Sequence, residues 1–172
     1  SEMCIRDRSR KDKHPPIIAI CDVSGSMSRY SRMLLHFMHV LTTLRNDVHT
    51  FLFGTRLTNV TRFLRFKDVD EALAATSSAV EDWSGGTRIG DCLKEFNFNW
   101  SRRVLGPGAI VLFITDGLDR GGGIGLSKQI KLIQKSSKRL IWLNPLLRYE
   151  EFAPKPTGVK AILPHVDEFR PI

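Results

Sequence analysis

Short apolar runs alternate with longer segments of helical periodicity along the chain from residue 16 onward. Runs that are apolar at every position are typical of parallel strands buried on both faces, whereas apolar residues every three or four positions indicate helices packed on one side. The strands expected from these patterns are residues 16–22, 48–54, 58–64, 109–117, 139–145 and 165–169, and the expected helices are 29–45, 68–82, 88–103, 125–138 and 158–163.

Strands that alternate with crossover helices predict an α/β fold, in which a central, mostly parallel sheet is flanked by helices on both faces. The helices should turn apolar stripes toward this sheet, and His36 and His39 should lie on the outer face of the helix 29–45. The residues expected to face inward are Leu34, Phe37, Met38, Leu41 and Leu44 in that helix, Ile89, Cys92, Leu93, Phe96 and Trp100 in 88–103, and Leu126, Ile130 and Ile133 in 125–138.

The length of 172 residues suits one domain, and no apolar run approaches the ~20 residues that a membrane span requires. Residues 1–14 have no apolar period and no signal-peptide core, and their string SEMCIRDR resembles a translated sequencing adapter. We therefore expect 1–14 to be a disordered or non-native segment and 15–172 to form the domain. This domain is expected to be the C-terminal part of a longer protein.

The number and spacing of the cysteines indicate the redox environment in which the protein works. Cys4, Cys21 and Cys92 are too few and too widely spaced for a disulfide framework or a zinc ribbon. A reducing compartment is therefore expected. The predicted location is the cytoplasm, with a peripheral position at the inner membrane face as the alternative.

The formal net charge of +8 raises the question of an anionic partner. Four lysines, Lys128, Lys131, Lys135 and Lys138, fall on the polar face of one predicted helix. No aromatic residue interleaves with them, although single-strand nucleic-acid binders need stacking platforms. The simplest interpretation of this lysine row is a solvated helix face. The second is a surface that binds an acidic protein or a membrane, and no nucleic acid is expected as a partner.

The candidate chemistry lies in polar residues that follow the predicted strands. Asp22, Ser24 and Ser26 stand at alternate positions after the first strand, and Gly25 permits a tight turn between them. Thr87 begins a predicted helix after two glycines, and Asp116 ends the strand 109–117. Ligands in parallel sheets bind at the carboxyl ends of the strands. Carboxylates and hydroxyls are hard oxygen donors, which suit Mg²⁺ or Mn²⁺ better than zinc.

The motifs DVSGSM, GGT and ITDG resemble the metal-ion-dependent adhesion site (MIDAS) of von Willebrand factor type A (VWA) domains, which have a Rossmann-like fold. The segments FLFGTRLTNVTRFL, DWSGGTRIGDCL, TDGLDRGG and RLIWLNPLLR are similar to the CoxE-like subgroup. That subgroup comprises accessory proteins of carbon-monoxide-dehydrogenase gene clusters and resembles the VWA partners of MoxR-type AAA+ ATPases.

The resemblance implies that Ser24, Ser26 and Thr87 supply hydroxyls to Mg²⁺, or to Mn²⁺ or Ca²⁺. It implies that Asp22 and Asp116 hold the ion directly or through water. The last coordination position would take an acidic side chain of the ATPase or of a client metalloenzyme. The implied function is that of a non-enzymatic adaptor in the maturation of a molybdenum hydroxylase such as carbon monoxide dehydrogenase.

Two alternatives remain open at this point. A metal-dependent phosphohydrolase could use Asp22, although such enzymes normally carry a second carboxylate where Ser24 stands. A generic adhesion or scaffold VWA module is the other. The sequence lacks the G-x-S-x-G elbow and the Walker motif. Asp91 and Asp119 are candidates for a place at the rim of the metal site, against the simpler reading as solvated loop residues.

Overall fold

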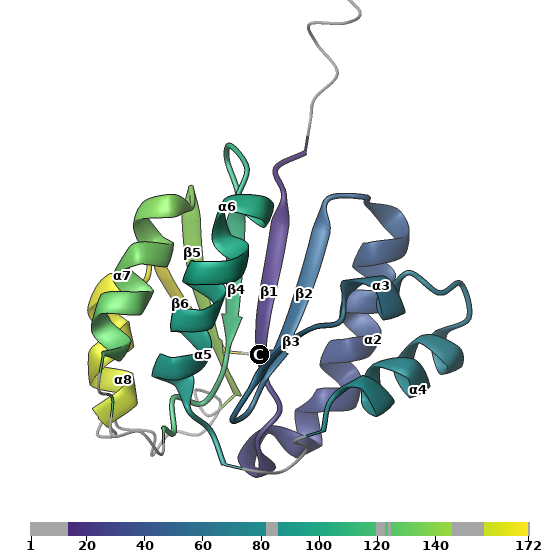
Figure 1. The fold of residues 1–172 in the computed structure, drawn as a ribbon, viewed down its shortest axis with the longest axis horizontal. Coiled ribbons are helices and arrows are strands. Elements are labelled where there is room, and N and C mark those ends of the chain that lie inside the picture. The colour runs from purple at the N-terminus through teal and green to yellow at the C-terminus, as the bar shows by residue number, and fades with distance from the viewer. Residues whose placement is uncertain (1–13, 82–85, 120–122, 124, 146–156, 172) are drawn as a thin grey trace, which may run out of the picture.

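One sheet of six strands forms the centre of the part of the chain that the structure, a computed structural model, describes (Figure 1). The strand order is β3-β2-β1-β4-β5-β6, and all neighbours are parallel except β2 and β3. The described residues are 14–81, 86–119, 123, 125–145 and 157–171. The strands are β1 (Ile17–Asp22), β2 (Val48–Phe53), β3 (Leu57–Asn59), β4 (Ile110–Ile114), β5 (Arg139–Asn144) and β6 (Glu168–Pro171).

Helices cover both faces of this sheet, so the protein has three layers (Figure 1). On one face α2, α3 and α4 enclose a core with the alternate residues of β1 and β2. On the other face α5, η2, α7 and α8 bury aromatic residues of the strands, including Phe51, Phe113 and Trp142. The helical elements are η1 (Gly25–Met27), α2 (Ser28–Leu44), α3 (Thr61–Leu64), α4 (Val69–Ala79), α5 (Ile89–Glu95), the π-helical η2 (Phe96–Trp100), α6 (Ser101–Val104), α7 (Leu126–Ser136), α8 (Thr157–Ile162) and η4 (Leu163–His165).

The predicted fold class is therefore confirmed. The fully apolar runs became the central strands β1, β4 and β5, because a strand between two helical layers exposes neither face to water. In the described part of the chain, no helix is both long and apolar enough to cross a bilayer. The predictions for residues 1–13 and for the glycine-bearing loop at 82–85 fall outside the described residues.

The prediction for the inward face of α2 was partly wrong. Leu34 and Met38 are buried as expected, but Phe37 is 51% exposed and Leu44 is 75% exposed. His39, expected on the outside, is buried, and its ring nitrogen Nε2 lies 2.7 Å from the Phe66 carbonyl oxygen. The cause is that α2 is apolar on several sides, and the neighbouring α3 segment determines which side is covered.

The strand predicted over 58–64 was also partly wrong. Residues Leu57–Asn59 form the antiparallel edge strand β3, but Thr61–Leu64 form a helical turn, α3. Asn59 Oδ1 accepts hydrogen bonds from the amide (3.1 Å) and the hydroxyl (2.6 Å) of Thr61. A side chain that satisfies the first amide of a turn favours helix over a continued strand.

Candidate metal centre

The residues singled out from the sequence lie at the carboxyl edge of the sheet, at the bottom of Figure 1. Asp22 is the last residue of β1, and Asp116 follows β4, the parallel neighbour of β1. Thr87 precedes α5, and the amide of the adjacent Arg88 donates to the carbonyl of Gly54 just beyond β2 (3.0 Å). Three separate loops thus meet where three neighbouring strands end.

Asp22 is held on both sides of its carboxylate and is only 1% exposed. Its Oδ1 accepts a hydrogen bond from the Ser24 amide (2.8 Å), and its Oδ2 accepts one from the Thr115 hydroxyl (2.7 Å). Burial raises the pKa of Asp22 to about 6, and the negative charge of Asp116 acts in the same direction, while the hydrogen bonds oppose it. The charged form of Asp22 therefore lacks a counter-charge, which a cation would supply.

The two serine hydroxyls converge in the turn after β1. Ser24 Oγ and Ser26 Oγ are 3.2 Å apart. The turn is the short 3-10 helix η1, closed by the Met27 amide, which donates to the Ser24 carbonyl oxygen (2.9 Å). Ser24 is buried and Ser26 is exposed, so the pair runs from the interior toward solvent.

Asp116 provides a buried acceptor that lacks a partner. Its Oδ1 accepts from the Leu118 amide (3.0 Å), but Oδ2 has no hydrogen-bond partner among the described residues. The residue is 1% exposed. A buried, unpaired carboxylate oxygen is costly, and it is the kind of atom that a bound cation satisfies.

Thr115 is a contributor that the sequence reasoning missed. Its hydroxyl donates to Asp22 Oδ2 and accepts from the Gly117 amide (3.1 Å), so it links the end of β1 to the loop after β4. The buried indole of Trp142 donates to the Thr115 carbonyl oxygen (2.8 Å) and braces the same loop from β5. The available signal was a hydroxyl residue in an otherwise apolar strand, directly before Asp116.

Asp119 joins two of the loops by hydrogen bonds, whereas Asp91 forms an exposed ion pair. Asp119 Oδ1 accepts from the Ile89 amide at the start of α5 (3.0 Å), and Oδ2 accepts from the Gly123 amide (3.1 Å). Asp119 thereby ties the segment that carries Thr87, which is 4% exposed, to the loop that carries Asp116. Asp91 is an exposed residue that pairs with Arg88 at 3.9 Å.

The donor set fits a hard divalent cation. The site offers two carboxylates and three hydroxyls, and oxygen donors of this kind suit Mg²⁺, Mn²⁺ or Ca²⁺. No group of three or more histidine, cysteine or acidic residues gathers anywhere in the described part of the chain. Cys21 and Cys92 are buried, and burial raises the pKa of the Cys21 thiol to about 12, so it remains protonated and inert.

The family comparison covers nearly the whole chain. The sequence model of the family described as "VWA domain containing CoxE-like protein" matches residues 2–172. A comparison with curated protein sequences gives no match.

Solved structures share the fold. A von Willebrand factor type A protein from Catenulispora acidiphila is 15% identical with a TM-score of 0.62, and the match covers 93% of this chain and 39% of that one. Proximal thread matrix protein 1 from the mussel byssus is 18% identical with a TM-score of 0.57, covering 92% of this chain and 44% of that one. Another structure of the mussel protein has a zinc-occupied MIDAS motif and is 16% identical with a TM-score of 0.54, covering 93% and 44%.

The chain spans less than half the length of these structural relatives. At such low identity they support the fold alone, whereas the family match extends over most of the sequence. The chain belongs to the family of VWA domain containing CoxE-like proteins.

Proposed function

We propose that this domain binds other proteins through a divalent metal ion, Mg²⁺ in the first instance, held by Asp22, Ser24, Ser26, Thr87 and Asp116. The observation that carries this proposal is the buried oxygen cluster at the carboxyl edge, where Asp116 Oδ2 has no partner among the described residues. Mn²⁺ and Ca²⁺ are the next candidates, because they take the same oxygen donors.

The metal centre leaves one coordination position for a further anion. Its two carboxylates formally balance the double positive charge, but the site supplies five donors, one fewer than the six oxygens that Mg²⁺ prefers. The ion would supply a Lewis-acidic position for an Asp or Glu side chain of a partner. The N-terminal end of α2, a helix of 17 residues, lies at the same edge and adds a favourable field for a carboxylate.

Binding agrees with the site better than hydrolysis. A phosphohydrolase that used Asp22 as its nucleophile would normally need a second carboxylate close by. The residue two positions later is Ser24, where such an enzyme would carry a second carboxylate. We therefore assign the domain a binding role and no catalytic residue.

The proposed partners are a MoxR-type AAA+ ATPase and its client, a molybdenum hydroxylase such as carbon monoxide dehydrogenase, in the cytoplasm. Family membership supports this choice. The net charge of +8 and the exposed lysines of α7 favour a partner with an acidic surface. In this role the domain is an adaptor that recognises a partner carboxylate.

The test is capture of a MoxR-type AAA+ ATPase by the immobilised domain in buffered Mg²⁺. We expect capture with the wild-type domain, and at least a tenfold loss with a chelator or with Asp22→Ala. Asp91→Ala, an exposed change outside the site, is the matched control and should capture normally. Capture that survives both the chelator and Asp22→Ala would overturn the proposal. Phosphatase turnover that Asp22→Asn removes would favour hydrolysis instead.

A further inference from the structure

A second concave site lies beside the edge strand β3, toward the opposite end of the sheet from the metal centre. It is an open hollow of about 560 Å³ lined from β2, β3, η2, α3 and the residue after α3. Its polar and aromatic lining residues are His49, Thr58, Asn59, Thr61, Arg62, Arg65 and Trp100. His49 precedes Phe53, the register partner of Asp22, by four residues in β2. At ~3.3 Å per residue the two sites are separated by roughly 13 Å along the sheet.

Positive charge gathers in this hollow without a matching acid. Its lining contains two arginines and one histidine and includes no aspartate or glutamate. Among the described residues, neither Arg62 nor Arg65 forms an ion pair, whereas five other arginines do. Burial and the nearby charge of Arg65 lower the pKa of His49, and the weaker, opposing influence is that of Asp47. Like charges in one depression repel, and an anion would relieve that repulsion.

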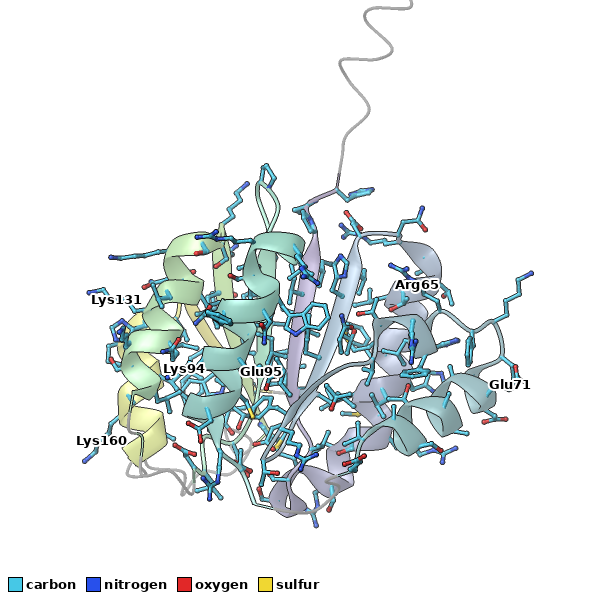
Figure 2. All side chains as sticks on the ribbon, viewed as in Figure 1. Arg65, Glu71, Lys94, Glu95, Lys131 and Lys160 are labelled. Atoms are coloured by element: carbon cyan, nitrogen blue, oxygen red, sulfur yellow. The ribbon has the colours of Figure 1, made fainter. Side chains whose placement is uncertain are left out.

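The remaining polar groups of the hollow are also donors. Asn59 Oδ1 is occupied by the two hydrogen bonds from Thr61, so its amide nitrogen is the group left to bind a ligand. Thr58 adds a hydroxyl. Trp100 lines another side, and the Arg103 guanidinium lies over its ring, 5.6 Å from the centroid, which brings a third arginine close to the rim. Figure 2 shows Arg65 directed outward from the upper part of the molecule.

We propose that this hollow, which we call the Arg62–Arg65 site, binds a phosphate group. Two guanidinium groups present positive charge, and together with the imidazole they offer N–H donors, which match a doubly charged tetrahedral anion better than a single carboxylate. A phosphate bound there would raise the pKa of His49, because its charge opposes that of Arg65. The site functions without the metal ion, so it extends the proposed function and does not depend on it.

The test is a titration of the ¹⁵N-labelled Asp22→Ala domain in metal-free buffer at low ionic strength, followed by NMR. Asp22→Ala removes the metal centre, which could otherwise bind phosphate through its ion, and chelators are avoided because they are anions themselves. We expect inorganic phosphate and glycerol phosphate to shift the His49 and Arg65 signals with a Kd on the order of millimolar, as weak exposed ion pairs give. Acetate at equal ionic strength should bind at least fivefold more weakly.

Two substitutions make the titration decisive. Arg65→Gln should weaken phosphate binding at least tenfold, and Arg65→Lys should fall between it and the parent, because lysine keeps the charge but loses the planar fork. Arg88→Gln, an exposed arginine on another loop, is the matched control and should change binding less than twofold. Equal loss in Arg65→Gln and Arg88→Gln would mean only general attraction by net charge and would overturn the site. Equal affinity for acetate would overturn the assignment to phosphate.

Discussion

Gly158→Ala is expected to destabilise the domain by roughly 2–3 kcal/mol, the upper range for overpacking a well-filled interior. A Cβ atom at position 158 would lie far inside 3.0 Å of the Gly117 carbonyl oxygen, a separation that real Cβ atoms essentially never show. Gly117 has a φ of +79° and has its own close neighbours in Val159 and Trp142, so it cannot yield easily. The close approach of α8 to this loop therefore requires glycine.

Thermal or chemical unfolding measures this effect, and a domain of this size should lose roughly 5–10 °C in Tm. Gly106→Ala is the matched control, since its Cβ would meet Pro16 at an ordinary 3.6 Å. We expect the control to stay within about 1 kcal/mol of the wild type. If Gly158→Ala were as stable as Gly106→Ala, α8 would not pack against the loop that carries Asp116 in the way described.

The metal-free domain is expected to lose stability as the pH rises through the titration of Asp22. The pKa of Asp22 is about 6 in the folded state and 3.8 in the reference state. The folded protein therefore holds the proton more tightly than the unfolded chain does, and this contribution is complete below about pH 4. It is lost between about pH 4 and pH 6, and one pKa unit corresponds to 1.36 kcal/mol, so the loss is about 3 kcal/mol.

Asp22→Asn isolates this contribution from the other carboxyl groups. Without metal, the variant should be more stable than the wild type at pH 7.5, by up to about 3 kcal/mol, and this difference should fall to about 1 kcal/mol at pH 4.5. Saturating Mg²⁺ should stabilise the wild type at pH 7.5 and leave the variant nearly unchanged, because the amide lacks the negative charge with which Asp22 would attract the ion. Denaturant unfolding at the two pH values measures both effects. If the free energies of unfolding of the two proteins changed in parallel with pH, Asp22 would not be a buried charge that lacks a counter-charge.

The sheet could be predicted because the continuous apolar pattern of its central strands differs from the pattern of the other elements. β1, β4 and β5 each contain four or five consecutive apolar residues, and a polar residue ends or directly follows each run. The polar residues that follow β1 and β4 had to share one edge once the sheet was parallel. For this reason Asp22 and Asp116 could be paired across 94 residues of sequence from pattern alone.

The helical face of α2 and the start of α3 could not be predicted in the same way. α2 carries apolar residues on several sides, and Met33, Phe37, Val40 and Leu44 turned out to be exposed. An apolar periodicity that fits two faces of a helix does not indicate which face packs against another element. The four residues of α3 follow β3 directly and were predicted to continue it as a strand, but the Asn59 side chain favours a helical turn.

The chemical set of the candidate site was visible in the sequence, but its support was not. Asp119 was a candidate for the rim of the site, but its hydrogen bonds to the Ile89 and Gly123 amides and the bond from Thr115 to Asp22 were not predicted. These hydrogen bonds depend on the distances between loops in the folded protein, which the spacing of residues in the sequence does not predict. The basic hollow beside β3 is of the same kind, because His49 and Arg65 meet only when β2 and α3 pack together.

The central claim is that the candidate metal centre holds a divalent ion and leaves one coordination position open to a partner. Its five ligands are Asp22, Ser24, Ser26, Thr87 and Asp116. The most direct measurement is anomalous scattering from crystals of the domain grown with Mn²⁺, a substitute for Mg²⁺ that takes the same donors. The account predicts one strong peak at the carboxyl edge, in contact with the Ser24 and Ser26 hydroxyls, that is missing in Asp22→Ala. A peak elsewhere, or one that persists in Asp22→Ala, would contradict it.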